Sequence, residues 1–318
     1  MKLLNNGWRF TAGGKSENVR LPHNIGGILP LHYLTPDHYT GKYEYSRTLN
    51  IPELKPDLRY FLQFDGAAHV AEVFVNGKKL AEHRCGYTGF RVDVTCALRP
   101  GENYISVLLD CTENPEFPPF GYVIDYLTYG GLYRDVWLDI RPKDHIEDVF
   151  IYTNPDFSLH FDLTVSGDFE SIETILKDAA GNEAGRREGR ELSFDLKIEE
   201  PRLWSPEEPN LYDCVVRMKA PSSEDCFETS VGIRTAVFKS DGFYLNGKKY
   251  FIRGLNRHQS FPYIGYAATE QLQRNDARIL KEELCCNAVR TSHYPQSPYF
   301  IDECDRLGIL VFTEFPGW

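Results

Sequence analysis

Three short segments near the end of the sequence carry side chains suited to hydrogen bonding and proton transfer. They are Arg257-His258-Gln259, Ser292-His293-Tyr294-Pro295 and Glu314-Phe315-Pro316-Gly317-Trp318. Imidazole rings and carboxylates are groups that enzymes often use to move protons, and both can also bind hydroxyl groups. Zinc binding by His258 and His293 is not expected, because no third and fourth ligand occurs at suitable spacing.

Each of these segments follows a short apolar stretch with the composition of a strand. The stretches are residues 251–256, 287–291 and 309–313. Helical patterns separate them: Thr269 is placed to cap the first helix, while Ser297 and Gly308 mark the start and end of the second. Alternating apolar strands and helices predict parallel strands, as in a doubly wound sheet or a (β/α)8 barrel. In such a barrel the segments that follow the strands line the active site.

The sequence around the second segment resembles the long signature of glycoside hydrolase family 2, the family of β-galactosidases and β-glucuronidases. The matching residues are Asn287-Ala-Val-Arg290-Thr-Ser-His293-Tyr294-Pro295, Phe300-Ile301, Asp305 and Gly308-Ile-Leu-Val-Phe312. A match of this length with fixed gaps is far more specific than a lone short motif.

The length and composition are those of an ordinary globular protein with two or three domains. The chain has 318 residues, of which 42% are hydrophobic and 25% are charged. Its net charge of −11 argues against a nucleic-acid partner, because binding DNA requires a basic face. No stretch has the apolar length of a signal peptide or a membrane span. The eight cysteines lack metal-ligand or disulfide spacing, so we expect reduced thiols in a cytoplasmic protein.

Alternating strands and turn signals in the first three quarters of the chain predict two β-sandwiches. Residues 1–142 resemble the family's sugar-binding jelly-roll domain, and Asn76-Gly77 is expected to form a tight hairpin turn. Residues 143–237 have the strand spacing of an immunoglobulin-like sandwich. Residues 238–318 are then the first part of a (β/α)8 barrel. The predicted fold class is therefore multidomain and mainly β.

The resemblance implies substrate-binding roles for three side chains. In similar galactosidases, the histidines at the positions of His258 and His293 contact the sugar. An aspartate nine residues before Arg134, here Asp125, reaches into the active site of those enzymes and helps to hold a sodium ion. The alternatives are that the two histidines only satisfy loop carbonyls and that Asp125 is an ordinary loop residue.

Four further residues are implied as support for the site: Arg290, Asn256, Glu314 and Tyr294. Arg290 corresponds to an arginine that keeps the family's nucleophilic glutamate ionised, and its alternative partner here is Glu314. Glycoside hydrolysis uses two carboxyl groups, and the family's acid/base and nucleophilic glutamates lie in later motifs that do not occur before Trp318. We infer a fragment that ends inside the barrel, with Glu314 as a subsite or structural carboxylate and a catalytic acid as the alternative.

The function predicted for the parent protein is that of a retaining exo-β-glycosidase with β-galactosidase-like specificity. The alternatives are β-glucuronidase or β-mannosidase specificity within the family, and a carbohydrate-binding protein without catalysis outside it. The fragment is expected to be inactive alone and to need no cofactor, whereas the full-length parent could use sodium or magnesium. The expected partner is a β-linked glycoside rather than nucleic acid or membrane, and a homo-oligomer is compatible with the sequence.

Overall fold

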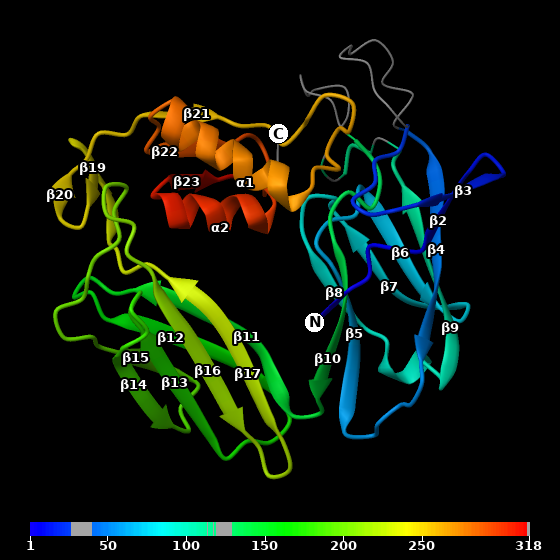
Figure 1. Ribbon diagram of the computed structural model, residues 1–318, viewed down its shortest axis with the longest axis horizontal. Coiled ribbons are helices and arrows are strands. Elements are labelled where there is room, and N and C mark those ends of the chain that lie inside the picture. The colour runs from blue at the N-terminus through cyan, green and yellow to red at the C-terminus, as the bar shows by residue number, and fades with distance from the viewer. Residues whose placement is uncertain (27–39, 113, 117, 119–128, 317–318) are drawn as a thin grey trace.

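The computed structural model describes residues 1–26, 40–112, 114–116, 118 and 129–316. These residues form two antiparallel β-sandwiches, followed by a small antiparallel sheet and a parallel sheet with two helices (Figure 1). Within these ranges no helix has the length and apolar character needed to cross a lipid bilayer.

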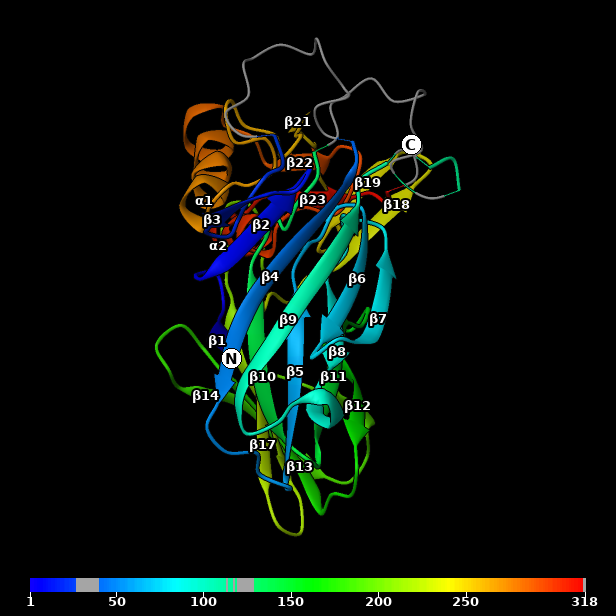
Figure 2. The same cartoon turned by 90° about the vertical axis from the view of Figure 1, so that its right-hand side faces the viewer.

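The first sandwich pairs a six-stranded sheet, of order β3-β2-β4-β9-β6-β7, with a four-stranded sheet, of order β1-β10-β5-β8. Figure 2 views the larger sheet face on. Alternate side chains point between the sheets, so that Leu62, Phe64, Val73 and Val75 are completely buried. The strands are β1 (Lys2–Leu3), β2 (Trp8–Ala12), β3 (Lys15–Val19), β4 (Lys42–Ile51), β5 (Leu58–Phe64), β6 (Val70–Val75), β7 (Lys78–Arg84), β8 (Phe90–Asp93), β9 (Gly101–Asp110) and β10 (Val136–Pro142).

The hairpin predicted at Asn76-Gly77 is confirmed between β6 and β7. Both residues have positive φ angles, 52° and 81°. A two-residue turn of this kind matches the twist of the flanking strands, which explains why an asparagine and a glycine occupy it.

The second sandwich pairs a three-stranded sheet, of order β11-β12-β15, with a four-stranded sheet, of order β14-β13-β16-β17. Phe161, Leu176 and Val216 are completely buried between them. This agrees with the predicted immunoglobulin-like sandwich. The strands are β11 (His145–Thr153), β12 (Leu159–Ser166), β13 (Ser171–Lys177), β14 (Glu183–Gly189), β15 (Ser193–Leu196), β16 (Tyr212–Lys219) and β17 (Glu224–Val231).

The remaining elements begin with a small antiparallel sheet and continue into three parallel strands. The parallel pairing predicted for these three strands is confirmed, in the order β21-β22-β23. The first strand is shorter than expected, because it begins at Gly254 and Phe251 is 79% exposed. The elements are β18 (Ala236–Lys239), β19 (Gly242–Leu245), β20 (Lys248–Lys249), β21 (Gly254–Asn256), α1 (Glu270–Arg278), a π-helical turn (Ile279–Glu283), β22 (Ala288–Thr291), α2 (Pro298–Leu307) and β23 (Leu310–Thr313).

Both helices begin where the sequence predicts, and the second also ends there, but neither has a side-chain capping bond at its start. Thr269 and Ser297 occupy the N-cap positions, yet neither side chain makes a capping hydrogen bond. The predicted N-cap position of Thr269 is therefore confirmed, although its side chain does not make the bond that usually accompanies this position. Gly308 ends α2 with a φ of 76°, the left-handed conformation that favours glycine after a helix.

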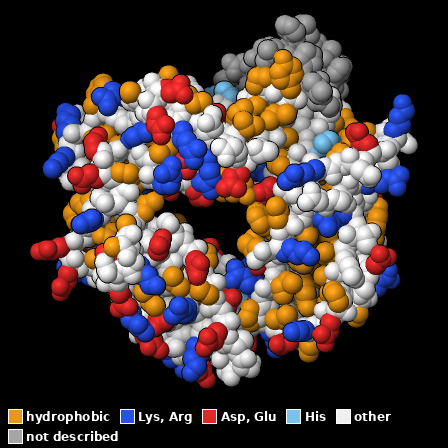
Figure 3. Space-filling view, in the orientation of Figure 1, with side chains coloured by type: hydrophobic (Ala, Val, Ile, Leu, Met, Phe, Trp, Pro, Cys, Tyr) orange, Lys and Arg blue, Asp and Glu red, His pale blue; other side chains and the backbone are white. Residues whose placement is uncertain are grey.

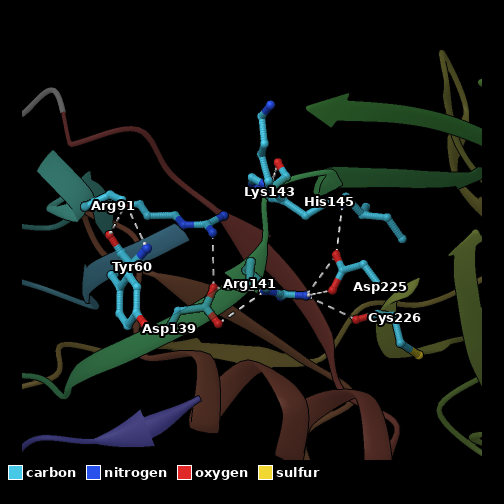
Figure 4. A network of polar contacts seen from close by, with 10 residues as sticks. Tyr60, Arg91, Asp139, Arg141, Lys143, His145, Asp225 and Cys226 are labelled. Atoms are coloured by element: carbon cyan, nitrogen blue, oxygen red, sulfur yellow. Dashed lines mark hydrogen bonds and ion pairs between the residues drawn. The ribbon is translucent and has the colours of Figure 1, made fainter. Parts of the chain in front are cut away.

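Arg141 joins the two sandwiches. Its guanidinium lies between Asp139 of the first sandwich, at 3.1 Å, and Asp225 of the second, at 3.0 Å (Figure 4). The same group donates to the carbonyl oxygen of Cys226 at 3.2 Å. Both aspartates are nearly buried, so these charge-assisted bonds hold the junction in one geometry.

Trp204 joins the second sandwich to the parallel sheet. Its indole N–H donates to the backbone oxygen of Asp305 in α2 at 2.8 Å. Its ring belongs to an apolar cluster with Phe243, Leu245, Ala288 and Leu310. This cluster covers one end of the parallel sheet.

An opening passes between the sandwiches and the helices in the space-filling view (Figure 3). Part of it is a cavity of about 1000 Å³ between the second sandwich and α2. Its lining is largely charged and includes Lys177, Asp213, Glu228, Arg274, Asp302 and Arg306. The second sandwich and the two helices therefore face each other across a polar space.

Candidate active site

The three parallel strands bring the predicted segments to one edge of the sheet. Asn256, Arg290 and Phe312 are aligned in register across β21, β22 and β23. Because the strands are parallel, the residues that follow them leave the sheet on the same side. His258 and His293 therefore approach each other at this edge, where Glu314 also lies.

A hollow of about 590 Å³ lies against the three strands. Val289 packs into the apolar cluster beneath the helices, so the neighbouring Arg290 points to the opposite face of the sheet. Arg290 and the exposed Asn256 both line the hollow, together with Phe312 and Glu314. Arg290, Asn256 and Glu314, three of the four predicted supporting residues, thus share this hollow.

The two histidines form a pair of rings. The ring centroids of His258 and His293 lie 5.5 Å apart with the planes at 73°. Nδ1 of His258 is 3.2 Å from the hydroxyl of Tyr294, which is completely buried. His258 is exposed and His293 is half-buried, so the pair meets solvent at the edge of the sheet.

Glu314 is bound by two of its neighbours. Nε of Arg290 donates to one carboxylate oxygen, and Nδ1 of His293 lies 3.0 Å from the other. Nδ1 of His293 is also 3.2 Å from a guanidinium nitrogen of Arg290, which can only donate. Because a carboxylate oxygen can only accept, and its contact with Nδ1 is the shorter of the two, the arrangement favours the tautomer in which His293 donates from Nδ1 to the carboxylate.

The surroundings of Glu314 keep it ionised. Burial raises the pKa of this carboxyl, but the hydrogen bonds from Arg290 and His293 outweigh burial and hold the pKa below its usual value. A general acid needs a raised pKa so that it still carries a proton near neutral pH. Glu314 therefore suits a role as a fixed negative charge better than a role as a proton donor.

Arg257 belongs to the scaffold beneath His258. It is 6% exposed and pairs with Asp276 of α1 at 2.7 Å. It also donates to Gln273 at 2.8 Å and to Gln296. These bonds tie the segment after β21 to α1 and to the loop before α2, and so fix where His258 leaves the sheet.

Tyr294 connects the site to the first sandwich. Its ring stacks on that of Tyr87, with centroids 4.2 Å apart and planes at 4°. Both belong to a buried tyrosine cluster that also contains Tyr129, Tyr133 and Tyr266. Tyr87 lies in the loop between β7 and β8, so the first sandwich directly supports a loop that carries a predicted site residue.

Asp125 lies outside the described residues, so its contacts with sugar and sodium stay predictions. Within the ranges that the structure describes, no group of three or more His, Cys, Asp or Glu side chains is arranged to hold a metal ion.

Three models of one enzyme family together match nearly the whole chain. The model described as "Glycosyl hydrolases family 2, sugar binding domain" matches residues 15–142. "Glycosyl hydrolases family 2" matches residues 144–234, and "Glycosyl hydrolases family 2, TIM barrel domain" matches residues 236–317.

Individual proteins of the same kind resemble the chain along its length. The beta-galactosidase of Thermoanaerobacterium thermosulfurigenes is 39% identical, over 99% of this chain and 48% of its own length. The beta-galactosidase of Thermoanaerobacter pseudethanolicus is 37% identical, over 99% of this chain and 45% of its own length. The crystal structure of an FMN-binding beta-glucuronidase from Facaelibacterium prausnitzii L2-6 has a TM-score of 0.88 and 30% identity, over 99% of this chain and 52% of that one. The chain thus spans about half the length of the relatives it matches.

Proposed function

Because this chain belongs to glycoside hydrolase family 2, we propose that it takes part in the hydrolysis of a β-linked glycoside, as part of a retaining exo-β-glycosidase. The observation that carries this proposal is the meeting of His258 and His293 beside the Arg290–Glu314 pair at the carboxyl edge of parallel strands. Active sites of (β/α)8 barrels are built at this edge.

The proposed roles follow from the chemistry of each group. His258 and His293 bind hydroxyl groups of the sugar, since both rings are accessible at the edge of the sheet. Arg290 supplies a positive charge that keeps a neighbouring carboxylate ionised, and Glu314 is that carboxylate among the described residues. Asn256 and Tyr294 support the site, the first in the hollow and the second beneath His258.

We propose a β-galactoside as the substrate. The two relatives named above that are most identical to this chain are beta-galactosidases, at 39% and 37%. A β-glucuronide is the second candidate, because the similar solved structure is a beta-glucuronidase at 30% identity. Comparing kcat/KM of the complete protein for a 4-nitrophenyl β-galactoside and the matching β-glucuronide decides between them. A β-mannoside serves as the third substrate, and binding of sugars without turnover of any would favour a carbohydrate-binding protein.

We expect the 318-residue chain alone to turn over no aryl β-glycoside. Glycoside hydrolysis needs two carboxyl groups flanking the bond, and Glu314 is the one acidic residue in the three segments after the parallel strands. The measurement is release of 4-nitrophenol by chain purified from a host without β-glycosidases. Turnover that disappears in Glu314→Gln would contradict this prediction and make Glu314 a catalytic residue.

In the complete protein, His258→Ala and His293→Ala should each lower kcat/KM by about 30-fold, or about 2 kcal/mol. Each change removes a hydrogen bond to a sugar hydroxyl that strengthens as the transition state forms. His160→Ala is the control, because His160 pairs with Asp195 in the second sandwich. Unchanged kinetics in both site variants would show that the histidines serve only the loops.

The proposal also includes the metal ions and the cellular compartment of the protein. Sodium or magnesium would act only in the complete protein, with Asp125 as a sodium ligand. All eight cysteines are free thiols, which supports a reducing compartment such as the cytoplasm.

A further inference from the structure

One arginine of the first sandwich contacts both loops that carry the histidines. Arg134 precedes β10 and is 6% exposed. Its Nη2 donates to Oε1 of Gln259, next to His258, at 2.9 Å. The same nitrogen donates to the backbone oxygen of Pro295, two residues after His293, at 2.9 Å. A single guanidinium nitrogen thus bridges the loop after β21 and the loop after β22.

The other side of the guanidinium is fixed to the sandwich. Nη1 of Arg134 donates to the backbone oxygen of Asp65 at 3.1 Å and to that of Tyr87 at 3.2 Å. The ring of Tyr133 lies 5.0 Å from the guanidinium. A Cβ atom at Gly66 would come within 2.9 Å of the Arg134 side chain, so the space is closed around it. The arginine therefore has little freedom to follow a displaced loop.

We propose that Arg134 is a positioning residue that sets the separation of His258 and His293. The planar guanidinium offers several donors in a fixed geometry, so the two loops are held at a defined distance from each other and from the sandwich. The stacking of Tyr87 on Tyr294 adds a second contact to the loop after β22. This inference rests on the proposed function, because the separation matters for sugar binding only if the histidines contact the substrate.

Hydrogen exchange of the 318-residue chain, followed by mass spectrometry, tests the proposal without any substrate. In Arg134→Met, the amides of residues 256–261 and 291–296 should exchange about tenfold faster or more, because charge-assisted bonds to both loops are lost. Amides of β4 and β9 should keep their exchange rates. In Arg134→Lys, the exchange rates of the two loops should lie between those of Arg134→Met and those of the unaltered chain, since an ammonium reaches fewer acceptors at once.

Arg141→Met is the matched control. Arg141 is also an arginine between two parts of the molecule, but it joins the sandwiches to each other. The Arg141→Met substitution should therefore leave the exchange rates of the two histidine loops unchanged. The proposal is overturned if both loops in Arg134→Met exchange as in the unaltered chain, or if β4 and β9 accelerate equally, which would mean general destabilisation. Should Arg134→Met fail to fold, Arg134→Lys supplies the same comparison.

Kinetics of the complete protein provide the functional readout. Arg134→Met should lower kcat/KM for an aryl β-glycoside by about 10- to 100-fold, because a small displacement of binding groups is costly in the transition state. Arg134→Lys should recover part of the loss, and Arg141→Met should retain the full value. Unchanged kcat/KM in Arg134→Met would overturn the positioning role. Absence of turnover by the unaltered complete protein would overturn the proposed function instead, and the exchange rates would still decide whether Arg134 holds the loops.

Discussion

Trp204→Ala is expected to lower the free energy of unfolding by about 3–5 kcal/mol. The Trp204 side chain is 1% exposed and fills an apolar cluster between the second sandwich and the parallel sheet. Removing it leaves a cavity that the surrounding Phe243 and Leu310 can close only in part. It also removes the indole donor to the backbone oxygen of Asp305. Urea denaturation followed by circular dichroism measures the change.

Two further variants show how much of this loss of stability comes from the apolar cluster and how much comes from the hydrogen bond. Trp204→Phe keeps an aromatic ring in the cluster but not the hydrogen bond, so its cost should be well below that of alanine. Trp137→Ala is the matched tryptophan control: Trp137 is half-buried on β10 and donates to Asp65 at 2.8 Å. A Trp204→Ala loss no greater than that of Trp137→Ala would show that the cluster does not hold the two parts together.

Acid should destabilise the chain through Glu303, by up to about 3 kcal/mol. Glu303 of α2 is 1% exposed and pairs with Arg306 at 2.6 Å, Arg278 at 2.9 Å and Arg274 at 3.4 Å. The hydrogen bond from Arg306 and the bond from Arg278 outweigh burial and lower the pKa of Glu303 to about 2. Because the folded pKa lies below the unfolded one, the stabilisation is fully present above about pH 4.5 and is lost as the pH falls towards 2.

The measurement is the free energy of unfolding at several pH values in the 318-residue chain and in Glu303→Gln. The variant should be less stable near neutral pH, and the difference between the two proteins should shrink between about pH 4.5 and 2. Glu270→Gln is the control, because Glu270 pairs with Arg274 at the surface and is 53% exposed. A difference between chain and variant that stays constant with pH would show that Glu303 does not hold its charge through the arginines.

The family, the fold class and the parallel strands could all be predicted from the sequence, and each is confirmed. The sequence did not reveal the strands β1, β2, β3, β7 and β14. Among these, β7 and β14 are seven-residue strands at the edges of their sheets. Edge strands carry many charged residues, as both of these do, and so lack the alternating apolar pattern that marks a strand. The domain boundaries at residues 142 and 237 stay predictions.

The meeting of His258, His293 and Glu314 was predictable because parallel strands deliver their following residues to a common edge. Tyr87 and Arg134 were not singled out as supports of this edge. Each contacts the histidine loops across more than a hundred residues of sequence, and no local spacing or periodicity records such a contact.

The opening seen in Figure 3 has a mechanical consequence. Three bodies joined end to end by two joints can fold and swing, whereas three bodies joined pairwise around a closed triangle have no internal degree of freedom. Arg141, Trp204 and Arg134 stand at the three joints of this triangle. The second sandwich, which supplies none of the described residues at the edge of the parallel sheet, therefore acts as a brace for the first sandwich as a whole. The hydrogen bonds of Arg134 to the two histidine loops do not pass through it, so the local geometry of those loops depends on Arg134 and not on Arg141.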